Sequence, residues 1–420
     1  MRLHMFDQSY DFACGIADLR QHLRMQLPFT APSSATRQHR TPKIFSGWAL
    51  DRAIMLDCAC SGLLASTLYF GPTRRQAVFL VMASIDWLGQ AEIACRLQRA
   101  IEGTVAPGQS DAAVIGRAIL LLRRPRDLVR ALFGSVPDGL VGALQRLGHD
   151  PVGGPETYQE LQRLFFSSAA ADRRRVKVLG QMAGSLLGAQ IEIVSLLDPV
   201  LLNPTFVSNV YETKQVAELN AALAYVRARC SGATDDAVGS SLSRLKPGDH
   251  RSTLYKWWIH RFDRLPRTLD TKGDPTLVIL GSAEALSDAG RRYANCLKSK
   301  VGEVYVGNYV YIEYRPAAPE PGAIAELRVT TQGFLLEGLY ARKNCKVRPE
   351  RAAAVRRKLA ACGVALYDHA PDEQDIVAAA AQVLNYYNFA EPDNTGWGVE
   401  FDEPPANDLE ELEIVASEAA

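Results

Sequence analysis

The feature that most constrains the fold is a series of three strand-like segments in the C-terminal third of the chain. Residues 308–315 (NYVYIEYR) are rich in β-branched and aromatic side chains, and 323–330 and 334–340 have the same character. Thr331-Gln332-Gly333 separates the second segment from the third, and glycine can take the positive φ that a short hairpin turn needs. The three segments therefore predict an antiparallel meander.

Helices flank the predicted meander. Ser282 or Ser287 can cap a helix that runs to about Lys298. After the meander, Pro349 begins a helix that continues through Cys362 to a Gly363 C-cap. Helix, meander and helix together define an α+β module, which we place at residues 250–368.

The preceding residues have helical spacing instead of strand-like alternation. Ser110 is an N-cap for a helix that has Val114, Ile115 and Ala118 on one face and stops before Pro125. We therefore expect a helical domain at 45–230. The predicted fold class is α+β, with a mostly helical N-terminal domain followed by a small antiparallel-sheet α+β module.

Composition sets the other boundaries. Residues 231–249 are rich in Ser, Gly and Asp and predict a linker, and 1–44 predict a poorly ordered N-terminal segment. Residues 390–420 contain ten Asp and Glu and no Lys or Arg, which predicts a disordered acidic tail. Residues 246–358 are basic in contrast, with 21 Lys and Arg against 12 Asp and Glu.

Cysteine usage and hydropathy predict a cytoplasmic protein with no membrane partner. The eight cysteines form no C-x-x-C pair and have no histidine at zinc-ligand spacing, so we expect reduced thiols and no metal site. The first twenty residues are charged and lack the apolar core of a signal peptide. The most apolar stretches contain Asp57 and Asp86, which favours buried helices. The common nucleotide, zinc-protease and serine-hydrolase motifs are absent from the sequence, and we expect no cofactor.

An ordered set of residues in the predicted module resembles a known family. The set consists of Leu286, Asp288-Ala289-Gly290, Tyr293, Asn295-Cys296-Leu297, Gly307, Tyr311-Ile312-Glu313-Tyr314-Arg315, Glu326-Leu327-Arg328, Gly338 and Asn344. It is similar to the pattern of the PcfJ-like proteins of bacterial conjugative plasmids and related mobile elements, between Leu286 and Gly363. The family has His before its Cys, where this chain has Asn295. The resemblance implies a fold and a biological setting more than a reaction.

Cys296 is the first candidate for chemistry. A nucleophilic thiol needs a nearby base, a cation or a helix N-terminus to lower its pKa. Cys296 is expected late in its helix, which favours a buried structural cysteine over a nucleophile or a metal ligand. Under the enzyme alternative, the catalytic candidates are Cys296, Asn295 and Asn344. Asp288 or Tyr293 would then lie nearby, and Glu313 or Glu326 would converge on the thiol.

Basic residues after the third strand are the second candidate. The set is Arg342, Lys343, Lys346, Arg348, Arg351, Arg356, Arg357 and Lys358. Such clustering suits a phosphate backbone, because each cation that meets a phosphate releases counterions. The alternative is a solvated surface that pairs with the chain's own acidic tail. Residues 256–262 (KWWIHRF) are a third candidate, either for base stacking or as a buried helical stripe.

The leading hypothesis is a non-enzymatic accessory or nucleic-acid-associated protein of a bacterial plasmid or mobile element. Its basic surface around 342–358 would contact phosphates. One alternative is an enzyme centred on Cys296, and another is a helical scaffold that binds other proteins. The expected partners are nucleic acid, the chain's own acidic tail or another protein.

Overall fold

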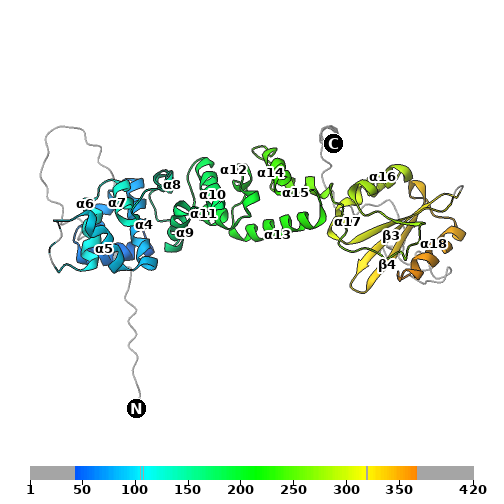
Figure 1. The fold of residues 1–420 in the computed structure, drawn as a ribbon, viewed down its shortest axis with the longest axis horizontal. Coiled ribbons are helices and arrows are strands. Elements are labelled where there is room, and N and C mark those ends of the chain that lie inside the picture. The colour runs from blue at the N-terminus through cyan, green and yellow to red at the C-terminus, as the bar shows by residue number, and fades with distance from the viewer. Residues whose placement is uncertain (1–42, 105, 107, 318–319, 367–420) are drawn as a thin grey trace, which may run out of the picture. The chain divides into compact units, whose positions relative to one another are not determined.

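The computed structural model describes residues 43–104, 106, 108–317 and 320–366. The predicted acidic tail and all but the last two residues of the predicted N-terminal segment lie outside these ranges. The described residues form two units (Figure 1). Unit 1 contains 43–225 and 233–255, and unit 2 contains 226–232 and 256–366.

Unit 1 is helical, as predicted. Its helices are α2 (Trp48–Ala59), α3 (Leu63–Leu68), α4 (Pro72–Leu88), α5 (Gln90–Ala100), α6 (Asp111–Leu121), α7 (Pro125–Phe133), α8 (Leu140–Arg146), α9 (Pro155–Phe166), α10 (Ala170–Gln181), α11 (Gly188–Leu196), η1 (Pro199–Leu201), α12 (Pro204–Val207) and α14 (Asp235–Ser243). Helices α13 (Thr213–Arg229) and α15 (Ser252–Ile259) have residues in both units. None of the helices in the described ranges has the length and apolarity that crossing a membrane requires.

Helix α4 is the centre of the first half of unit 1. Pro72 begins it at the position where a missing N–H costs nothing, and residues 75–85 are all buried. It packs against α5, α7, α8 and α9. Buried Gln76 donates to the carbonyls of Gly148 and Asp150 at 3.2 and 2.6 Å and accepts from the Tyr158 hydroxyl at 2.6 Å. These hydrogen bonds satisfy the polar side chain inside an otherwise apolar core.

The predicted linker at 231–249 is wrong in its central part, which forms α14. Thr234 caps this helix by accepting from the N–H of Ala237 at 3.2 Å. Val238 and Leu242, four residues apart, are buried on one side of it. A segment rich in Ser, Gly and Asp therefore folds as part of unit 1, because one apolar stripe and one cap are enough to hold a short helix.

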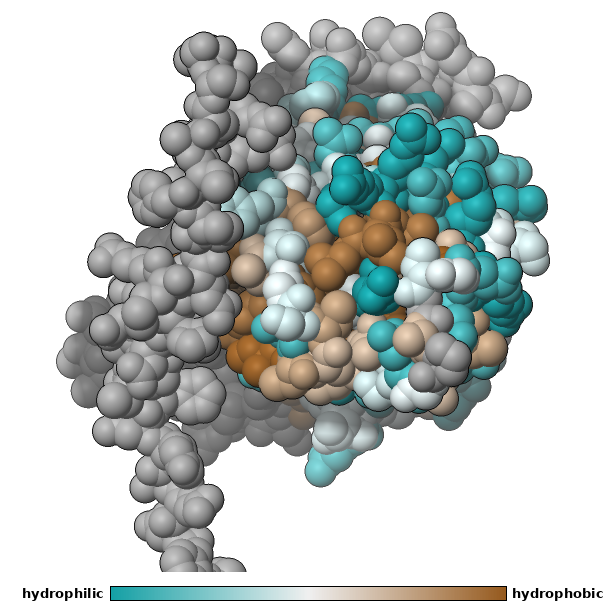
Figure 2. All heavy atoms as spheres, turned by 90° about the vertical axis from the view of Figure 1, so that its left-hand side faces the viewer, coloured by the Kyte–Doolittle hydropathy of each residue, from teal (hydrophilic) through white to brown (hydrophobic). Residues whose placement is uncertain are grey.

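One face of unit 1 carries apolar side chains on its surface. Figure 2 shows them at the centre and lower left of the face, with hydrophilic side chains above and to the right of them. Exposed large hydrophobic residues of the unit include Ile54 in α2 and Leu121 in α6, two helices that pack against each other. A face of this kind is what the scaffold alternative requires.

Unit 2 confirms the predicted α+β module. Its elements are β1 (Leu277–Ile279), α16 (Ala283–Tyr293), η2 (Cys296–Lys300), α17 (Val301–Val306), β2 (Tyr309–Tyr314), β3 (Ala323–Thr330), β4 (Gly333–Tyr340), η3 (Arg342–Asn344) and α18 (Pro349–Ala361). The strands form one antiparallel sheet in the order β1-β2-β3-β4. The short strand β1 was not predicted. Gly333 has the positive φ, 136°, that the hairpin turn was expected to need.

The two faces of the sheet have different roles. Alternate residues of β2 and β3, including Val310, Ile312 and Ala325, pack with Val355 and Leu359 of α18 in one hydrophobic core. The other alternating set, which includes Tyr311, Glu313 and Glu326, lies on the opposite face. The sheet is therefore apolar where it meets α18 and rich in hydroxyl and carboxylate groups on its second face.

Candidate functional site around Cys296 and the basic loop

Cys296 lies at the start of η2, and not late in a helix as predicted. Ser282 caps α16 by accepting from the N–H of Ala285 at 3.0 Å, and α16 ends at Tyr293. Ala294 then takes a left-handed conformation with φ 50°, and the Asn295 side chain caps η2 by accepting from the N–H of Leu297 at 3.3 Å. Cys296 is exposed. The expectation of a buried structural cysteine is therefore wrong.

Asn344 is beside the Cys296 thiol. Its Nδ2 lies 3.9 Å from Cys296 Sγ, although the two residues are 48 positions apart in the sequence. A tight loop after β4 places it there, closed by the N–H of Ala341 donating to the carbonyl of Cys345 at 2.8 Å. Lys343 and Asn344 both have positive φ in this loop, 59° and 56°. Such a conformation is unfavourable for lysine and is held by the surrounding structure.

A carboxylate flanked by two tyrosines lies on the same face of the sheet. Glu326 accepts from the Tyr311 hydroxyl at 2.5 Å and from the Tyr340 hydroxyl at 3.0 Å. A bulge next to Glu326 shifts the pairing of β3 with β4 and changes the direction of the side chains there. Burial, reinforced by the negative charge of Glu326, raises the pKa of both tyrosines. Both therefore stay protonated and donate to the carboxylate.

Lys300 and Tyr340 each interact electrostatically with both the Cys296 thiol and the Glu326 carboxylate. Lys300 Nζ lies 3.2 Å from Glu303 Oε1. Burial alone would lower the pKa of Lys300, but Glu303, Glu326 and Cys296 together raise it, so the ammonium stays charged. The pKa of Tyr340 is also raised by burial and then by Glu326 and Cys296. Asn344 thus lies beside the Cys296 thiol, and both Cys296 and Glu326 act electrostatically on Lys300 and Tyr340.

The chemical groups at the site are a thiol, an amide, an ammonium and a hydrogen-bonded carboxylate. In the described part of the chain no imidazole hydrogen-bonds to the thiol. Asn295, which replaces the histidine of the PcfJ-like pattern, is occupied as the cap of η2. Within the same ranges no three His, Cys, Asp or Glu side chains are grouped so that they could hold a metal ion.

The other residues expected near Cys296 have different partners. Asp288 forms an ion pair with Arg291 on the surface of α16. Glu313 is 3% exposed and accepts from Arg292 and Arg315, both at 2.6 Å. Burial alone would raise the pKa of Glu313, but these two hydrogen bonds outweigh it and hold the pKa below the ordinary value. Burial and the Glu313 charge raise the pKa of Tyr293 to about 12. The buried Glu313 carboxylate and the two arginines that donate to it therefore stabilise the fold.

The predicted nucleic-acid-binding residues lie in the loop that carries Asn344 and on α18. Five of them are exposed, and their side chains have no hydrogen bond or ion pair with any described residue. We call these five the basic surface: Arg342, Lys343, Arg348, Arg356 and Arg357. Lys346 is exposed between them. Lys358 instead pairs with Asp274 at 2.6 Å, and this contact lowers the Asp274 pKa to about 2. Lys358 is therefore not available to a ligand in the way that was predicted.

The third candidate is part of the core. Trp258 is 3% exposed and Phe262 is 1% exposed, and the Phe262 ring packs against Tyr305. Arg261 lies over the Trp258 ring, 5.2 Å from its centroid. These positions match the buried helical stripe and not a base-stacking surface.

Sequence reasoning missed Lys300, Tyr311 and Tyr340 as members of the site. They are brought together by strand register and by the bulge beside Glu326, which are long-range features. The alternation in residues 308–315 was the available signal, because it puts Tyr311 and Glu313 on one face.

Comparisons with protein-family models, with curated proteins and with solved structures give no match for this chain. The resemblance to PcfJ-like proteins therefore stays a prediction. The positions that carry it have structural reasons of their own. Gly307 has φ 89°, and a Cβ there would lie 2.9 Å from Pro266 Cγ, so glycine is required. Asn344 lies 3.9 Å from the Cys296 thiol, and Glu326 accepts from the hydroxyls of Tyr311 and Tyr340.

Proposed function

We propose that unit 2 is a nucleic-acid-associated module that holds a phosphate backbone on the basic surface. The observation that carries the proposal is that five exposed Lys and Arg side chains have no carboxylate partner among the described residues. Isolated surface cations gain little by ordering alone, whereas each cation that meets a phosphate releases counterions.

The spacing of the cations supports a linear polyanion as the ligand. Arg348 is the N-cap of α18, and Arg356 lies eight residues further along. Eight residues are a little over two helical turns, about 12 Å, so both side chains start from the same side of the helix. Neighbouring phosphates of one strand are about 3.4 Å apart along a duplex, so such a helix side can follow several of them.

The test is fluorescence anisotropy with a labelled single-stranded DNA and a labelled RNA of equal length at about 50 mM salt. Replacing Arg356 and Arg357 with Ala removes two cations of the basic surface and should weaken binding about tenfold or more. The matched control is Arg123→Ala with Arg124→Ala, an adjacent pair of exposed arginines in unit 1 whose side chains also lack described partners. The control should leave binding unchanged.

Equal losses in the two double variants would contradict a local binding surface, and no binding by the full chain would remove the proposal. The setting that we propose is the cytoplasm of a bacterium, on a plasmid or another mobile element. It rests on the resemblance to PcfJ-like proteins.

A second candidate function is thiol chemistry at Cys296. It is favoured by one observation, the exposed thiol 3.9 Å from the Asn344 amide with Lys300 nearby. A cation stabilises the thiolate, which is the reactive form. Lys300→Met should therefore slow the alkylation of Cys296 by iodoacetamide several-fold at pH 7. The control thiol is Cys95, which lies 3.9 Å from an Arg99 guanidinium nitrogen in unit 1. Unchanged labelling of Cys296 in the variant would contradict activation by Lys300.

A further inference from the structure

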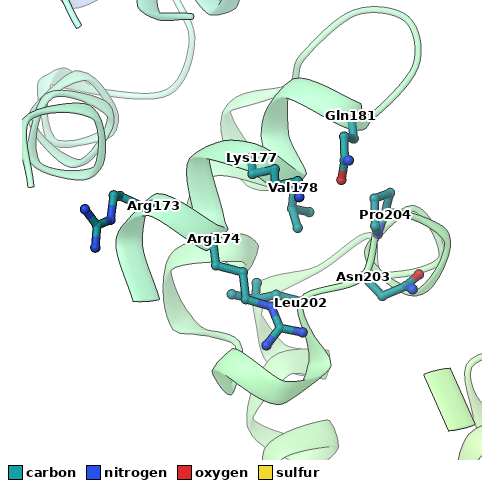
Figure 3. Close-up of a pocket in the computed structure, with 8 residues that line it drawn as sticks. All are labelled: Arg173, Arg174, Lys177, Val178, Gln181, Leu202, Asn203 and Pro204. Atoms are coloured by element: carbon teal, nitrogen blue, oxygen red, sulfur yellow. The ribbon is translucent and has the colours of Figure 1, made fainter. Parts of the chain in front are cut away.

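A pocket of about 500 Å³ lies between α10 and the segment Leu202–Pro204 in unit 1. Figure 3 shows the side chains that line it, with Lys177, Val178 and Gln181 on α10 and Pro204 across from them. Arg174 lies beside Leu202 in this view, whereas Arg173 points away from Asn203 and Pro204. The pocket is separate from the basic surface and from Cys296, which belong to unit 2.

The charge of the pocket is positive and not compensated. Arg173, Arg174 and Lys177 are exposed, and their side chains have no hydrogen bond or ion pair with a described residue. The carboxylate closest in sequence, Asp172, is 5% exposed and is already occupied. It accepts from Arg163 at 3.0 Å and from Arg175 at 3.1 Å. No aspartate or glutamate lines the pocket.

Arg175 shows what a structural arginine on the same helix does. It donates to Asp172 and to the carbonyls of Val194 and Leu197, at 3.0 and 3.3 Å for the carbonyls. Its side chain is 14% exposed. Arg174 and Lys177 have none of these contacts, so the fold of α10 does not depend on them. Their charge is available to a ligand.

The remaining lining combines an apolar floor with a further donor. Val178 and Leu202 are each 3% exposed, and Pro204 adds apolar surface. Asn203 uses its Oδ1 to accept from the N–H groups of Thr205 and Phe206 at 2.9 and 3.2 Å. Its Nδ2 has no partner among the described residues. The pocket therefore offers cations and an N–H donor above a small hydrophobic floor.

We propose that this pocket binds a small organic phosphate monoester. A phosphate dianion has the charge and the several acceptor oxygens that Arg174, Lys177 and the Asn203 amide can satisfy together. The organic part of the ligand lies on Val178 and Leu202, where its burial adds binding free energy. A carboxylate has one negative charge and fewer acceptor positions, so it satisfies the same groups less completely.

The test uses three simple probes in calorimetric titrations of the full chain: phenyl phosphate, inorganic phosphate and benzoate. Phenyl phosphate should bind most tightly, inorganic phosphate more weakly because it lacks the ring, and benzoate at least about tenfold more weakly than phenyl phosphate. Arg174→Ala with Lys177→Ala should weaken phenyl phosphate binding at least about tenfold. Circular dichroism should show the helix content unchanged.

A matched pair of arginines serves as the control. Arg123→Ala with Arg124→Ala removes two exposed arginines elsewhere in unit 1 and should leave phenyl phosphate binding unchanged. The inference is overturned if benzoate binds as tightly as phenyl phosphate, if the control loses as much as the pocket variant, or if phenyl phosphate does not bind. None of these outcomes depends on nucleic-acid binding by unit 2.

Discussion

The arginines around Glu313 and the arginines of the basic surface belong to the same unit but differ in what they contact. Arg292 and Arg315 both donate to a carboxylate that is 3% exposed. Arg348, Arg356 and Arg357 contact no described carboxylate. A cation that neutralises a buried acid is required by the fold, because an unpaired buried charge is costly. A cation without such a partner is free to interact with another molecule.

The same distinction separates Arg175 from Arg174 in unit 1, and it also separates two thiols of unit 2. Cys230 is 2% exposed, and its Sγ lies 3.4 Å from the Trp258 carbonyl. Cys296 is exposed and has a side chain from a distant loop beside it. The comparison teaches that residue type alone does not identify a site. A site is identified by side chains whose charged or hydrogen-bonding groups have no partner within the fold.

The largest expected effect concerns the two thiols. Burial raises the pKa of Cys230 to about 11, so very little of it is thiolate at pH 8. Iodoacetamide should therefore label Cys296 at least about 100 times faster than Cys230 in the folded protein, and both at similar rates in urea. Peptide mass spectrometry at several labelling times measures both rates. Similar rates in the folded protein would place Cys296 in the interior.

The next effect concerns stability. Glu313→Gln removes the charge that Arg292 and Arg315 neutralise and should lower the free energy of unfolding by about 2–3 kcal/mol. Arg356→Ala with Arg357→Ala should change it by no more than about 0.5 kcal/mol, because neither side chain has a described partner. Urea denaturation followed by the fluorescence of Trp257 and Trp258, which belong to unit 2, measures the free energy of unfolding of both variants. A larger loss in the arginine variant would show that the basic surface is part of the fold.

A smaller effect is expected from pH. The pKa of Glu313 is lowered in the folded state, so its contribution to stability is present above the ordinary glutamate value of 4.5 and is lost as pH falls through the lowered value. Glu313→Gln should remove this part of the acid destabilisation. Urea denaturation between pH 3 and 7 measures it, with Gln at the exposed Glu320 as the control for losing one carboxylate. Parallel pH profiles of wild type and Glu313→Gln would contradict the assignment.

Local patterns were enough to predict much of unit 2. β3 has the predicted bounds 323–330, and α18 begins at Pro349 as expected. Ser110 caps α6 as predicted by accepting from the N–H of Ala113 at 3.3 Å. In each case one residue type has a strong local preference, and tertiary contacts agree with it.

The errors come from places where tertiary contacts decide. α16 ends at Tyr293 and its C-cap is Ala294, a residue type that rarely takes positive φ, so no sequence signal marks the end of the helix. Helix α14 depends on Val238 and Leu242 finding a core to pack against. The approach of Asn344 to Cys296 and the contacts of Glu326 depend on strand register, which one sequence does not reveal.

The central claim is that the unpaired cations of unit 2 hold phosphates, and the salt dependence of single-stranded DNA affinity tests it most directly. Each phosphate contact adds about 0.7 to the slope of log affinity against log salt. The slope should therefore fall by roughly 1.4 when Arg356 and Arg357 are both replaced with Ala, and should stay unchanged in the Arg123→Ala, Arg124→Ala control. Equal slopes for wild type and the Arg356, Arg357 variant would contradict the claim.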